Sequence, residues 1–510
     1  MKINSIVLCG NNLETWLVAS FLTRRVPNVD LTVLETNKEY SNKNRSSGEF
    51  LSLFIQLLEI DETDWMHKAD AIFTAGSEYH KFSEKNNHFI VPNGMYELPS
   101  DQQTRLDMRT LFDIKNENSK KVDSKDILNY ITYNSWLIHK NKMTDVFKTT
   151  EGLKTPFTTS HNFTYSFSEE KMISFLKEYF CTGVRIITNE SSEETSGVTV
   201  IRNEKNEIQE IKIPSYTFKA DLYIDCTSNS ILLNKEENEF VKVSTFIDDR
   251  KDSFTIPYRN EKEQIKNVRN SISLMAIDEG YLRKIPSWNQ CSFDVVYSSK
   301  FSEEGDVEKS ISKLFEHEIT HNHTEVLNGS YFNSWDSNLI LLGPAYSKHE
   351  SKFTLSDSII CECLFNIIEL INSDPEPYLI FDYNLKTRRT TITTFENDIL
   401  FNLLTNYKNS KYWETISSEE HNAITSNYNM LTSLISNESV SPIQMFTLLG
   451  FDYPLFNSKF RTSILVKQDK EYKKYLEYML FGYKQYMEQM EAEVAEFQTN
   501  YEFLTKTIYV

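Results

Sequence analysis

Hydrophobic residues near the start of the chain follow strand, helix and strand patterns in turn. Residues 3–9 form a short apolar run that ends at Gly10, and residues 16–22 form an apolar segment typical of a helix. Residues 29–35 are strand-like again and end at Glu35, about 20 residues after the turn, where dinucleotide-binding proteins hold a ribose hydroxyl with an acid. The pattern predicts a Rossmann-like βαβ unit.

The turn of this unit has lost most of its glycines. In a turn that binds a dinucleotide, the second glycine lets the backbone approach the pyrophosphate and the third lets helix and strand pack closely. These positions are Asn12 and Thr15, and only Gly10 remains a glycine. Glu14 suits the helix dipole but repels a phosphate. An ordinary strand-turn-helix and an altered dinucleotide site both remain open.

Later hydrophobic runs predict an α/β (α+β) fold with a helical end. Residues 220–226 and 338–345 each form a buried strand, and residues 240–296 add an inserted β-sheet region. We therefore predict two parts: residues 1–375, an FAD-binding-type Rossmann-like domain with interleaved substrate-domain strands, and residues 376–510, a mainly helical C-terminal subdomain.

The last helix has the clearest periodicity in the chain. We expect one long amphipathic helix over about residues 468–505. Its apolar positions follow spacings of four and three: Leu476, Leu480, Tyr483, Met487, Met490, Val494, Phe497, Tyr501 and Leu504. This stripe packs either on the helices of its own chain or on another copy or another protein.

Composition restricts the partners of the protein. The 510 residues include 33 Phe and 27 Tyr, enough for a large core, and the net charge of −19 argues against nucleic acid or an anionic membrane as the main partner. No stretch of 18 apolar residues occurs, so we expect no membrane span. The six scattered cysteines indicate a reducing compartment, and we expect a cytoplasmic protein.

Two residue pairs were considered as metal ligands. His321 and His323 have no Cys or acid at ligand spacing, and Cys361 and Cys363 lie two apart on a helix and face different directions. We therefore predict no metal site.

A series of short sequence blocks, each different, follows a fixed order along most of the chain. They are residues 6–21 with Trp16, Leu34-Glu35, Gly48-Glu49 and residues 71–76, 163–168, 220–228, 278–286, 296–301, 342–356, 407–413 and 449–454. In this order they resemble the flavin-dependent tryptophan halogenases. The resemblance implies the fold of those enzymes.

The family's chemistry implies particular residues at particular places. Reduced flavin and oxygen give a hydroperoxide, halide attacks it, and hypohalous acid passes to a separate substrate pocket. There a lysine hydrogen-bonds or captures the oxidant, because its ammonium has three donors and a charge. A glutamate stabilises the cationic intermediate or removes its proton.

This chain departs from the family at those catalytic places. The lysine position falls on Thr74 and the glutamate position on Phe353, and neither side chain can take over the role. Glu350 aligns with an acid that precedes the family's catalytic glutamate, and Thr354 aligns with the family's serine. A shifted register would allow Lys81 or Lys352 to replace the lysine. We therefore predict that no intact Lys/Glu pair is present.

Other family positions are partly kept. The substrate-pocket signature with two tryptophans has become Tyr281 and Arg283, followed by Ile285 and Pro286, and two flavin-loop glycine positions have become Ser46 and Ser228. The positions that would contact a retained cofactor are Gly10, Asn12, Thr15, Glu35, Gly48, Glu49, Asp225 and Gly343.

The combined losses predict a degenerate member of the family. We expect no bound cofactor, or FAD if any, and a non-catalytic protein reused for binding or assembly through its C-terminal helix. By analogy with members carried by marine phages, this includes a phage structural protein in the host cytoplasm or the virion. The alternatives are an FAD-dependent halogenase or other oxidoreductase acting on an aromatic or small organic substrate, and an enzyme with another cofactor.

Overall fold

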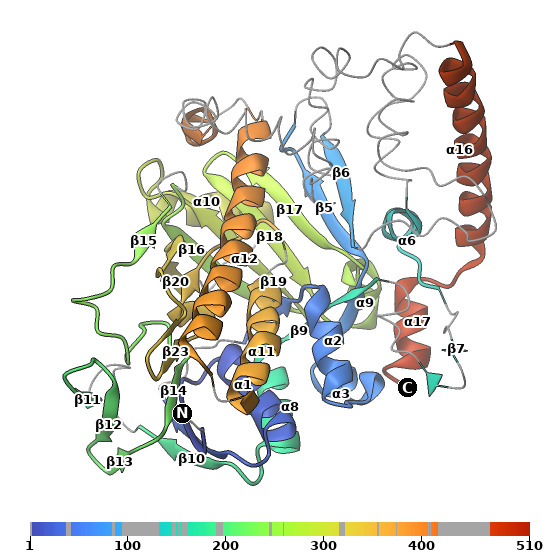
Figure 1. Ribbon diagram of the computed structural model, residues 1–510. Coiled ribbons are helices and arrows are strands. Elements are labelled where there is room, and N and C mark those ends of the chain that lie inside the picture. Colours follow the sequence, from blue (N-terminus) through green and yellow to red (C-terminus); the bar gives the residue numbers. More distant parts are fainter. Residues whose placement is uncertain are drawn as a thin grey trace.

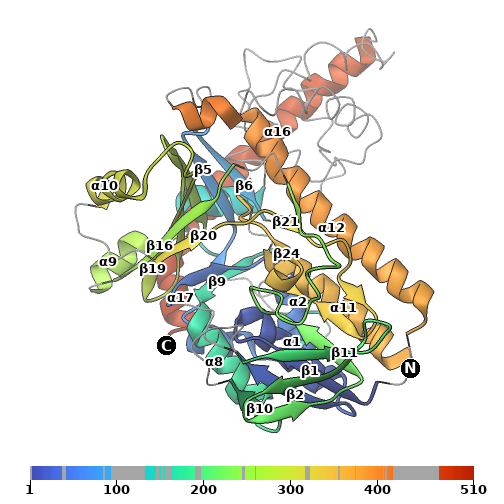
Figure 2. The ribbon, with the colours of Figure 1, turned by 90° about the vertical axis from the view of Figure 1, so that its left-hand side faces the viewer.

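The computed structural model describes the chain except for a set of segments, the longest near the C-terminus. The segments left out are residues 1–2, 37–41, 84–86, 94–131, 145–148, 151–152, 155–161, 190–196, 244–246, 259, 316–321, 354–355, 374, 406, 408–409 and 417–469. The remainder contains two main sheets, one in the upper part and one in the lower part of Figure 1, with helices packed around them (Figures 1 and 2).

A six-stranded sheet contains the predicted N-terminal unit. Its order is β10-β2-β1-β14-β23-β22, and every pairing is parallel except that of β22 with β23. The bounds are Ser5–Cys9 for β1, Asp30–Glu35 for β2, Arg185–Thr188 for β10, Leu222–Asp225 for β14, Trp335–Asp336 for β22 and Leu339–Leu341 for β23. Central parallel strands bury both faces, which explains their continuous apolar runs. The predicted α/β fold class is confirmed.

Helices cover one face of this sheet and a small sheet covers the other. The helices are α1 (Leu13–Arg25), α2 (Glu49–Leu57), α3 (Glu62–Lys68), α8 (Glu169–Phe180) and α11 (Ser356–Ser373). Trp16, Phe54 and Leu364 are fully buried in the core that these helices form. On the opposite face, Tyr223 packs with Ile211 of β12 (Ile208–Ile213), which pairs with β11 (Thr199–Arg202) and β13 (Tyr216–Phe218).

A seven-stranded sheet contains the predicted inserted β region. Its order is β20-β16-β19-β18-β17-β5-β6, and every pairing is antiparallel except that of β17 with β5. The bounds are Gly76–His80 for β5, His88–Pro92 for β6, Arg250–Pro257 for β16, Ile272–Ile277 for β17, Gly280–Pro286 for β18, Gln290–Tyr297 for β19 and Asn322–Glu325 for β20.

Short elements connect the two sheets. A three-stranded sheet joins β3 (Asn44–Ser46), β9 (Thr164–Ser168) and β4 (Ile72–Thr74). The other elements are β7 (Thr149–Thr150), β8 (Leu153–Lys154), β15 (Val241–Lys242), β21 (Gly329–Ser330), β24 (Ser347–Lys348), α6 (Tyr133–Lys140), α9 (Glu261–Asn267), α10 (Glu304–Phe315) and the 3-10 turn η1 (Gly343–Ala345). Among the described residues, no helix is both long and apolar enough to cross a membrane.

The described C-terminal part is largely helical, as expected, but its last helix is broken. After α12 (Pro377–Leu404) come α16 (Lys470–Glu496) and α17 (Asn500–Thr507). Thr499 begins α17 with a capping box: its hydroxyl accepts from Glu502 N, and the Glu502 carboxylate accepts from Thr499 N. Such a cap satisfies backbone donors that a continuous helix would use internally. The single helix predicted over residues 468–505 is therefore two helices.

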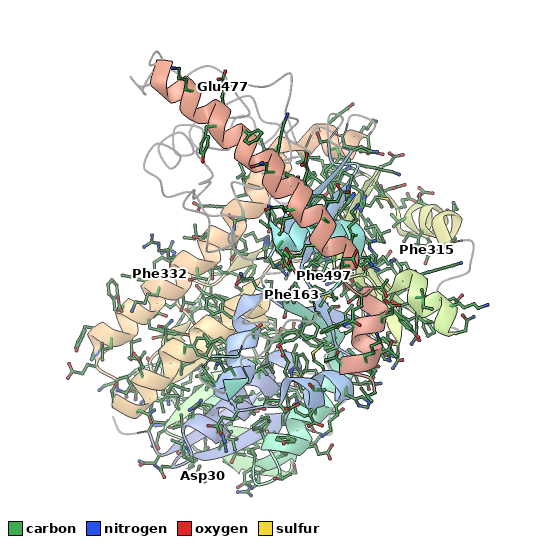
Figure 3. The ribbon with its side chains drawn as sticks, turned by 90° about the vertical axis from the view of Figure 1, so that its right-hand side faces the viewer. Asp30, Phe163, Phe315, Phe332, Glu477 and Phe497 are labelled. Carbon is green, nitrogen blue, oxygen red and sulfur yellow. The ribbon has the colours of Figure 1, made fainter. Side chains whose placement is uncertain are left out.

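The two ends of α16 have different surroundings. At the C-terminal end Met490 and Val494 are buried in the main core, and α6 packs beside them. At the N-terminal end α16 extends beyond the body of the molecule (Figure 3), and Tyr478 and Phe481 are 64% and 60% exposed. At the C-terminal end of α16, the apolar stripe therefore packs against its own chain.

Candidate functional site

A cleft opens at the carboxyl ends of β1, β14 and β23, the edge of a parallel sheet at which ligands bind in doubly wound folds. Its volume is about 670 Å³. The lining includes Asn12, Glu14, Lys43, Arg45, Glu169, Ser228, Lys251, Gly343, Lys348, His349, Glu350 and Ser351. Candidate residues from distant parts of the sequence thus share one cavity.

The Asn12 side chain closes the turn between β1 and α1. Its Oδ1 accepts hydrogen bonds from Thr15 N at 2.9 Å and Thr15 Oγ1 at 2.7 Å, and its Nδ2 donates to Cys226 O at 2.7 Å. Gly10 has φ +143°, and a Cβ there would lie 2.2 Å from Thr15 Oγ1. A glycine is therefore required at position 10. Asn12 Oδ1 accepts the hydrogen bond from Thr15 N, a backbone donor at the helix N-terminus that an anion would otherwise bind.

Glu14 is held by a basic residue from β3. Its Oε1 lies 2.8 Å from Arg45 Nη2, and Arg45 Nε lies 3.0 Å from Glu169 Oε1 on α8. Lys43 is 3.9 Å from the other oxygen of Glu169. A row of alternating charges therefore crosses the floor of the cleft.

The ribose-position acid, Glu35, is also paired within the chain. Its Oε1 lies 2.5 Å from Lys177 Nζ, and its Oε2 accepts from Thr188 Oγ1 at 3.1 Å. Lys177 Nζ also lies 4.3 Å from the centre of the Trp16 ring. Both carboxylate oxygens of Glu35 therefore have partners.

The remaining cofactor positions have local structural roles. Asp225 is fully buried and accepts from Thr227 N, Thr227 Oγ1 and Leu232 N at 2.7–2.9 Å. Gly343 has φ +57°, and a Cβ there would lie 2.8 Å from Glu14 Cγ. Gly48 is the N-cap residue of α2, and the side chain of Glu49 lies outside the described residues.

Thr74, expected from the resemblance at the lysine position, is buried and hydrogen-bonded to another threonine. Its Oγ1 lies 2.7 Å from Thr164 Oγ1, and Asn93 Nδ2 donates both to Thr74 O and to Thr164 Oγ1. Of the two lysines that a shifted register would use, Lys81 is exposed on the β5–β6 turn.

Phe353, expected from the resemblance at the glutamate position, belongs to an aromatic cluster. Its ring centre lies 6.1 Å from that of Tyr79 and 5.7 Å from that of Phe401. Phe82 and Trp413 continue the cluster, and all five side chains are buried. Thr354 lies outside the described residues.

Glu350 forms an ion-pair network at the wall of the cleft. Its carboxylate contacts Lys251 and lies 2.6 Å from Arg283 Nη2. Burial by itself would raise the pKa of Glu350, but these two cations hold that pKa well below its usual range. Tyr281 donates to Glu350 O at 3.3 Å, so Tyr281 and Arg283 both contact this residue.

The end of the substrate-pocket signature anchors two strands. Ile285 O accepts from Asn44 Nδ2 at 2.8 Å, and Pro286 O accepts from the Ser166 hydroxyl. Ile285 is 4% exposed. These contacts join β18 to β3 and β9.

Asp398, which the sequence did not single out, organises the loop between β24 and Phe353. It lies on α12, fully buried, and accepts from Ser351 Oγ at 2.6 Å and Lys352 N at 2.7 Å. Its Oδ2 lies 2.7 Å from His349 Nε2. Burial by itself would raise the pKa of Asp398, but His349 and Lys352 lower it.

Lys352 is buried beside Tyr281 and is not among the residues that line the cleft. Its side chain is fully buried, and its Nζ lies 4.0 Å from Asp248 Oδ2 and 4.6 Å from the centre of the Tyr281 ring. Of the histidines proposed as metal-ligand candidates, His323 has Nδ1 2.8 Å from Asp252 Oδ1, and His321 lies outside the described residues.

Comparison with known proteins supports the resemblance. A family model described as tryptophan halogenase matches residues 5–465. Tryptophan 7-halogenase KtzQ of Kutzneria sp. (strain 744) is 20% identical over 390 residues, covering 67% of this chain and 65% of the relative. Tryptophan 6-halogenase ThaL of Streptomyces albogriseolus is 21% identical over 374 residues, covering 68% and 65%. The chain thus spans slightly less than two thirds of these relatives' lengths.

Solved structures show the same fold over the full length. The apo structure of VirX1 superposes with a TM-score of 0.84 at 20% identity and covers 100% of both chains. Xcc4156, a flavin-dependent halogenase from Xanthomonas campestris, has a TM-score of 0.79 at 16% identity and covers 99% of both. With the family model matching most of the sequence, the chain belongs to the tryptophan halogenase family.

Proposed function

We propose that this chain is a family member that has lost flavin-dependent halogenation and is retained as a binding or assembly protein. The hydrogen bonds of Asn12 carry the proposal. Asn12 Oδ1 accepts from the Thr15 N–H, and the residue is 4% exposed, so it lies inside the turn that should receive a pyrophosphate. A phosphate would have to break these hydrogen bonds and then meet the Glu14 carboxylate.

The pairing of Glu35 also supports the loss of flavin. Glu35 is paired with Lys177 and Thr188, so a ribose hydroxyl would have to compete with an ion pair. The described residues around the β1–α1 turn therefore do not fit a flavin dinucleotide.

The catalytic positions support loss of halogenation independently of the flavin. Thr74 has a short neutral side chain engaged with Thr164, and Phe353 is packed among aromatic rings. Lys352 is fully buried beside Tyr281 and Asp248. Lys251 and Glu350 contact each other at the wall of the cleft, but neither stands at the lysine or glutamate position that the resemblance implies.

A flavin titration tests the proposal. We expect purified full-length protein mixed with FAD to remain colourless after desalting, and to leave flavin fluorescence unquenched at micromolar concentrations. Uptake of FAD with micromolar affinity or better would contradict the loss of flavin binding.

A variant shows whether the named residues cause this loss. The double change N12G/K177A frees the turn and Glu35, so it is expected to bind FAD more tightly than the unmodified chain. K171A is the matched control, because Lys171 lies on the same helix but pairs with Asp70 at 2.5 Å. Equal, absent binding by all three proteins would mean that other positions block the flavin.

One observation favours a second function. The cleft persists at the carboxyl ends of β1 and β14, and Gly10 and Gly343 keep their positive φ angles. An FAD-dependent oxidoreductase acting on an aromatic or small organic substrate would use this space, and the same titration distinguishes it.

The exposed end of α16 is the surface that we propose for self-association or for another protein, including in a phage particle. Replacing Tyr478 and Phe481 by serine is expected to shift the sedimentation coefficient toward that of a monomer, because it removes the exposed apolar area. Tyr378 and Phe381 on α12, both 64% exposed, give a matched serine pair that should have no effect. Identical sedimentation of both variants and the unmodified chain would exclude self-association through this end of α16.

A further inference from the structure

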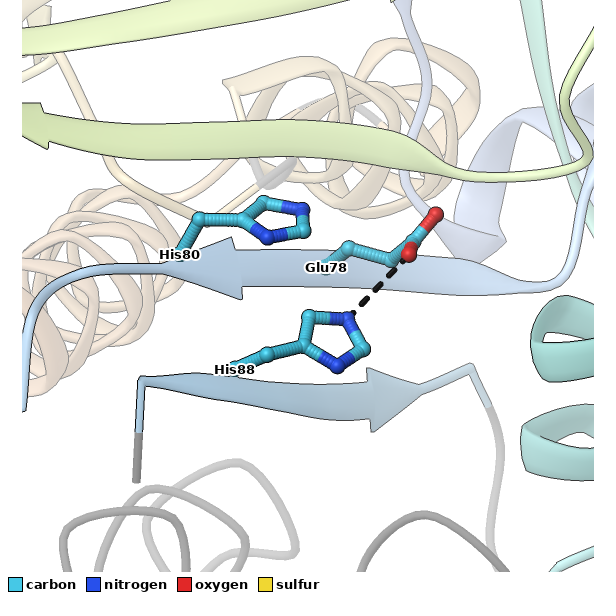
Figure 4. Close-up of side chains that lie close together, drawn as sticks. All are labelled: Glu78, His80 and His88. Carbon is cyan, nitrogen blue, oxygen red and sulfur yellow. Dashed lines mark hydrogen bonds and ion pairs between the residues drawn. The ribbon is translucent and has the colours of Figure 1, made fainter. Parts of the chain in front are cut away.

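Three side chains with metal-ligating atoms converge on one face of the β5–β6 hairpin, outside the cleft (Figure 4). Glu78 and His80 are two residues apart on β5, and His88 on β6 pairs directly with His80. Side chains two apart on a strand share a face, whereas the intervening Tyr79 packs in the aromatic cluster on the other side. The hairpin register therefore brings two imidazoles and a carboxylate together.

The ligand atoms are close to metal-binding separations. One donor atom from each of the three residues lies within 4.8 Å of the other two, and His88 Nε2 is 3.2 Å from Glu78 Oε2. In a tetrahedral zinc site with bonds of about 2.0–2.1 Å, neighbouring ligand atoms are about 3.3 Å apart. The two imidazole rings are stacked with centres 4.6 Å apart, so the His80 ring must turn about its side-chain bonds to direct a nitrogen at an ion shared with His88.

The carboxylate is oriented by its second oxygen. Glu78 Oε1 accepts from Arg269 Nη2 at 2.9 Å and from the Ser271 hydroxyl, which leaves Oε2 facing His88. Hydrogen bonds to the outer oxygen are how proteins hold a ligating carboxylate in position. Arg269 also places a positive charge beside the site, which reduces its affinity for a cation.

We propose that Glu78, His80 and His88 bind one divalent transition-metal ion of the zinc class. Two imidazole nitrogens and one carboxylate oxygen suit zinc, cobalt or nickel, whereas magnesium and calcium select oxygen donors. Three protein ligands leave a fourth position for water. His88 is on β6, at the edge of the described sheet, and its side chain is 28% exposed, which allows the ion to enter. The prediction of no metal site considered other residues.

Zinc binding by the full-length protein tests this inference. After chelator treatment and desalting, the protein should compete with a chromophoric chelator for one zinc ion per chain, and added zinc should raise the melting temperature. Cobalt in place of zinc should give a visible d–d absorption band without any substitution. Absence of both zinc retention and the cobalt band would overturn the proposal.

Variants assign the ligands. H80Q and H88Q should each weaken zinc binding by about tenfold or more, and R269Q should strengthen it because a nearby positive charge is removed. H323Q is the control, since His323 is also paired with an acid but lies on β20, away from the cluster. Far-UV circular dichroism checks that each variant folds. Zinc binding that survives in H80Q/H88Q, or that H323Q weakens equally, would contradict the assignment.

Discussion

Replacing Glu350 by alanine is expected to lower the free energy of unfolding by about 3 kcal/mol, because it leaves Lys251 and Arg283 without their shared counter-charge. The side chains of Lys251, Arg283 and Glu350 are only 12–18% exposed, so water would solvate an unpaired charge among them poorly. Asp294, 3.8 Å from Arg283 Nε, offsets part of the loss and places the effect at the low end for buried pairs. Urea unfolding at neutral pH measures the change.

A surface pair on the same sheet provides the control. Glu325 pairs with Arg250 at 3.3 Å but is 75% exposed, so E325A should cost less than about 1 kcal/mol. A loss of less than about 1 kcal/mol for E350A as well would show that the Glu350 network does not stabilise the fold.

The Glu350 network also predicts an acid-side loss of stability. The pKa of Glu350 is lowered in the folded chain, so its contribution is fully present above its ordinary pKa of 4.5 and is lost as the pH falls through the lowered value. The E350Q variant cannot ionise at this position. Its stability should therefore fall less steeply than that of the unmodified chain below pH 4.5.

Replacing Val494 by aspartate is expected to cost at least about 3 kcal/mol, because a carboxylate would enter the core without a partner. Val494 is fully buried at the C-terminal end of α16, in the same core as Phe503 and Leu504. The melting temperature should drop, whereas the sedimentation behaviour of the folded fraction should stay unchanged because this contact is within one chain.

Ala492 on the exposed face of α16 supplies the matched control. A492D introduces the same charge two residues away, where solvent accepts it, and should change stability by less than about 0.5 kcal/mol. If V494D were as stable as A492D but changed the oligomeric state, the buried half of the stripe would be an interface between chains.

Local patterns predicted most of the fold. The βαβ unit, the strands at 220–226 and 338–345 and the helical end follow from periodicity, which depends on neighbours only a few residues apart. The break before α17 was missed, although Thr499 and Glu502 have the spacing of a capping box. The apolar stripe continues through the break, so it favoured one helix.

Residue identity alone shows that Asn12, Thr74 and Phe353 are not glycine, lysine and glutamate, the residues that the resemblance implies at these positions. The partners of the charged groups around the cleft follow only from how the chain packs. Lys177 reaches Glu35 across 142 residues, and Asp398 binds a loop 46 residues away. Ion pairs and hydrogen bonds act over a few ångströms, so packing rather than sequence spacing selects such partners. The Glu78, His80 and His88 cluster likewise depends on the register of a hairpin.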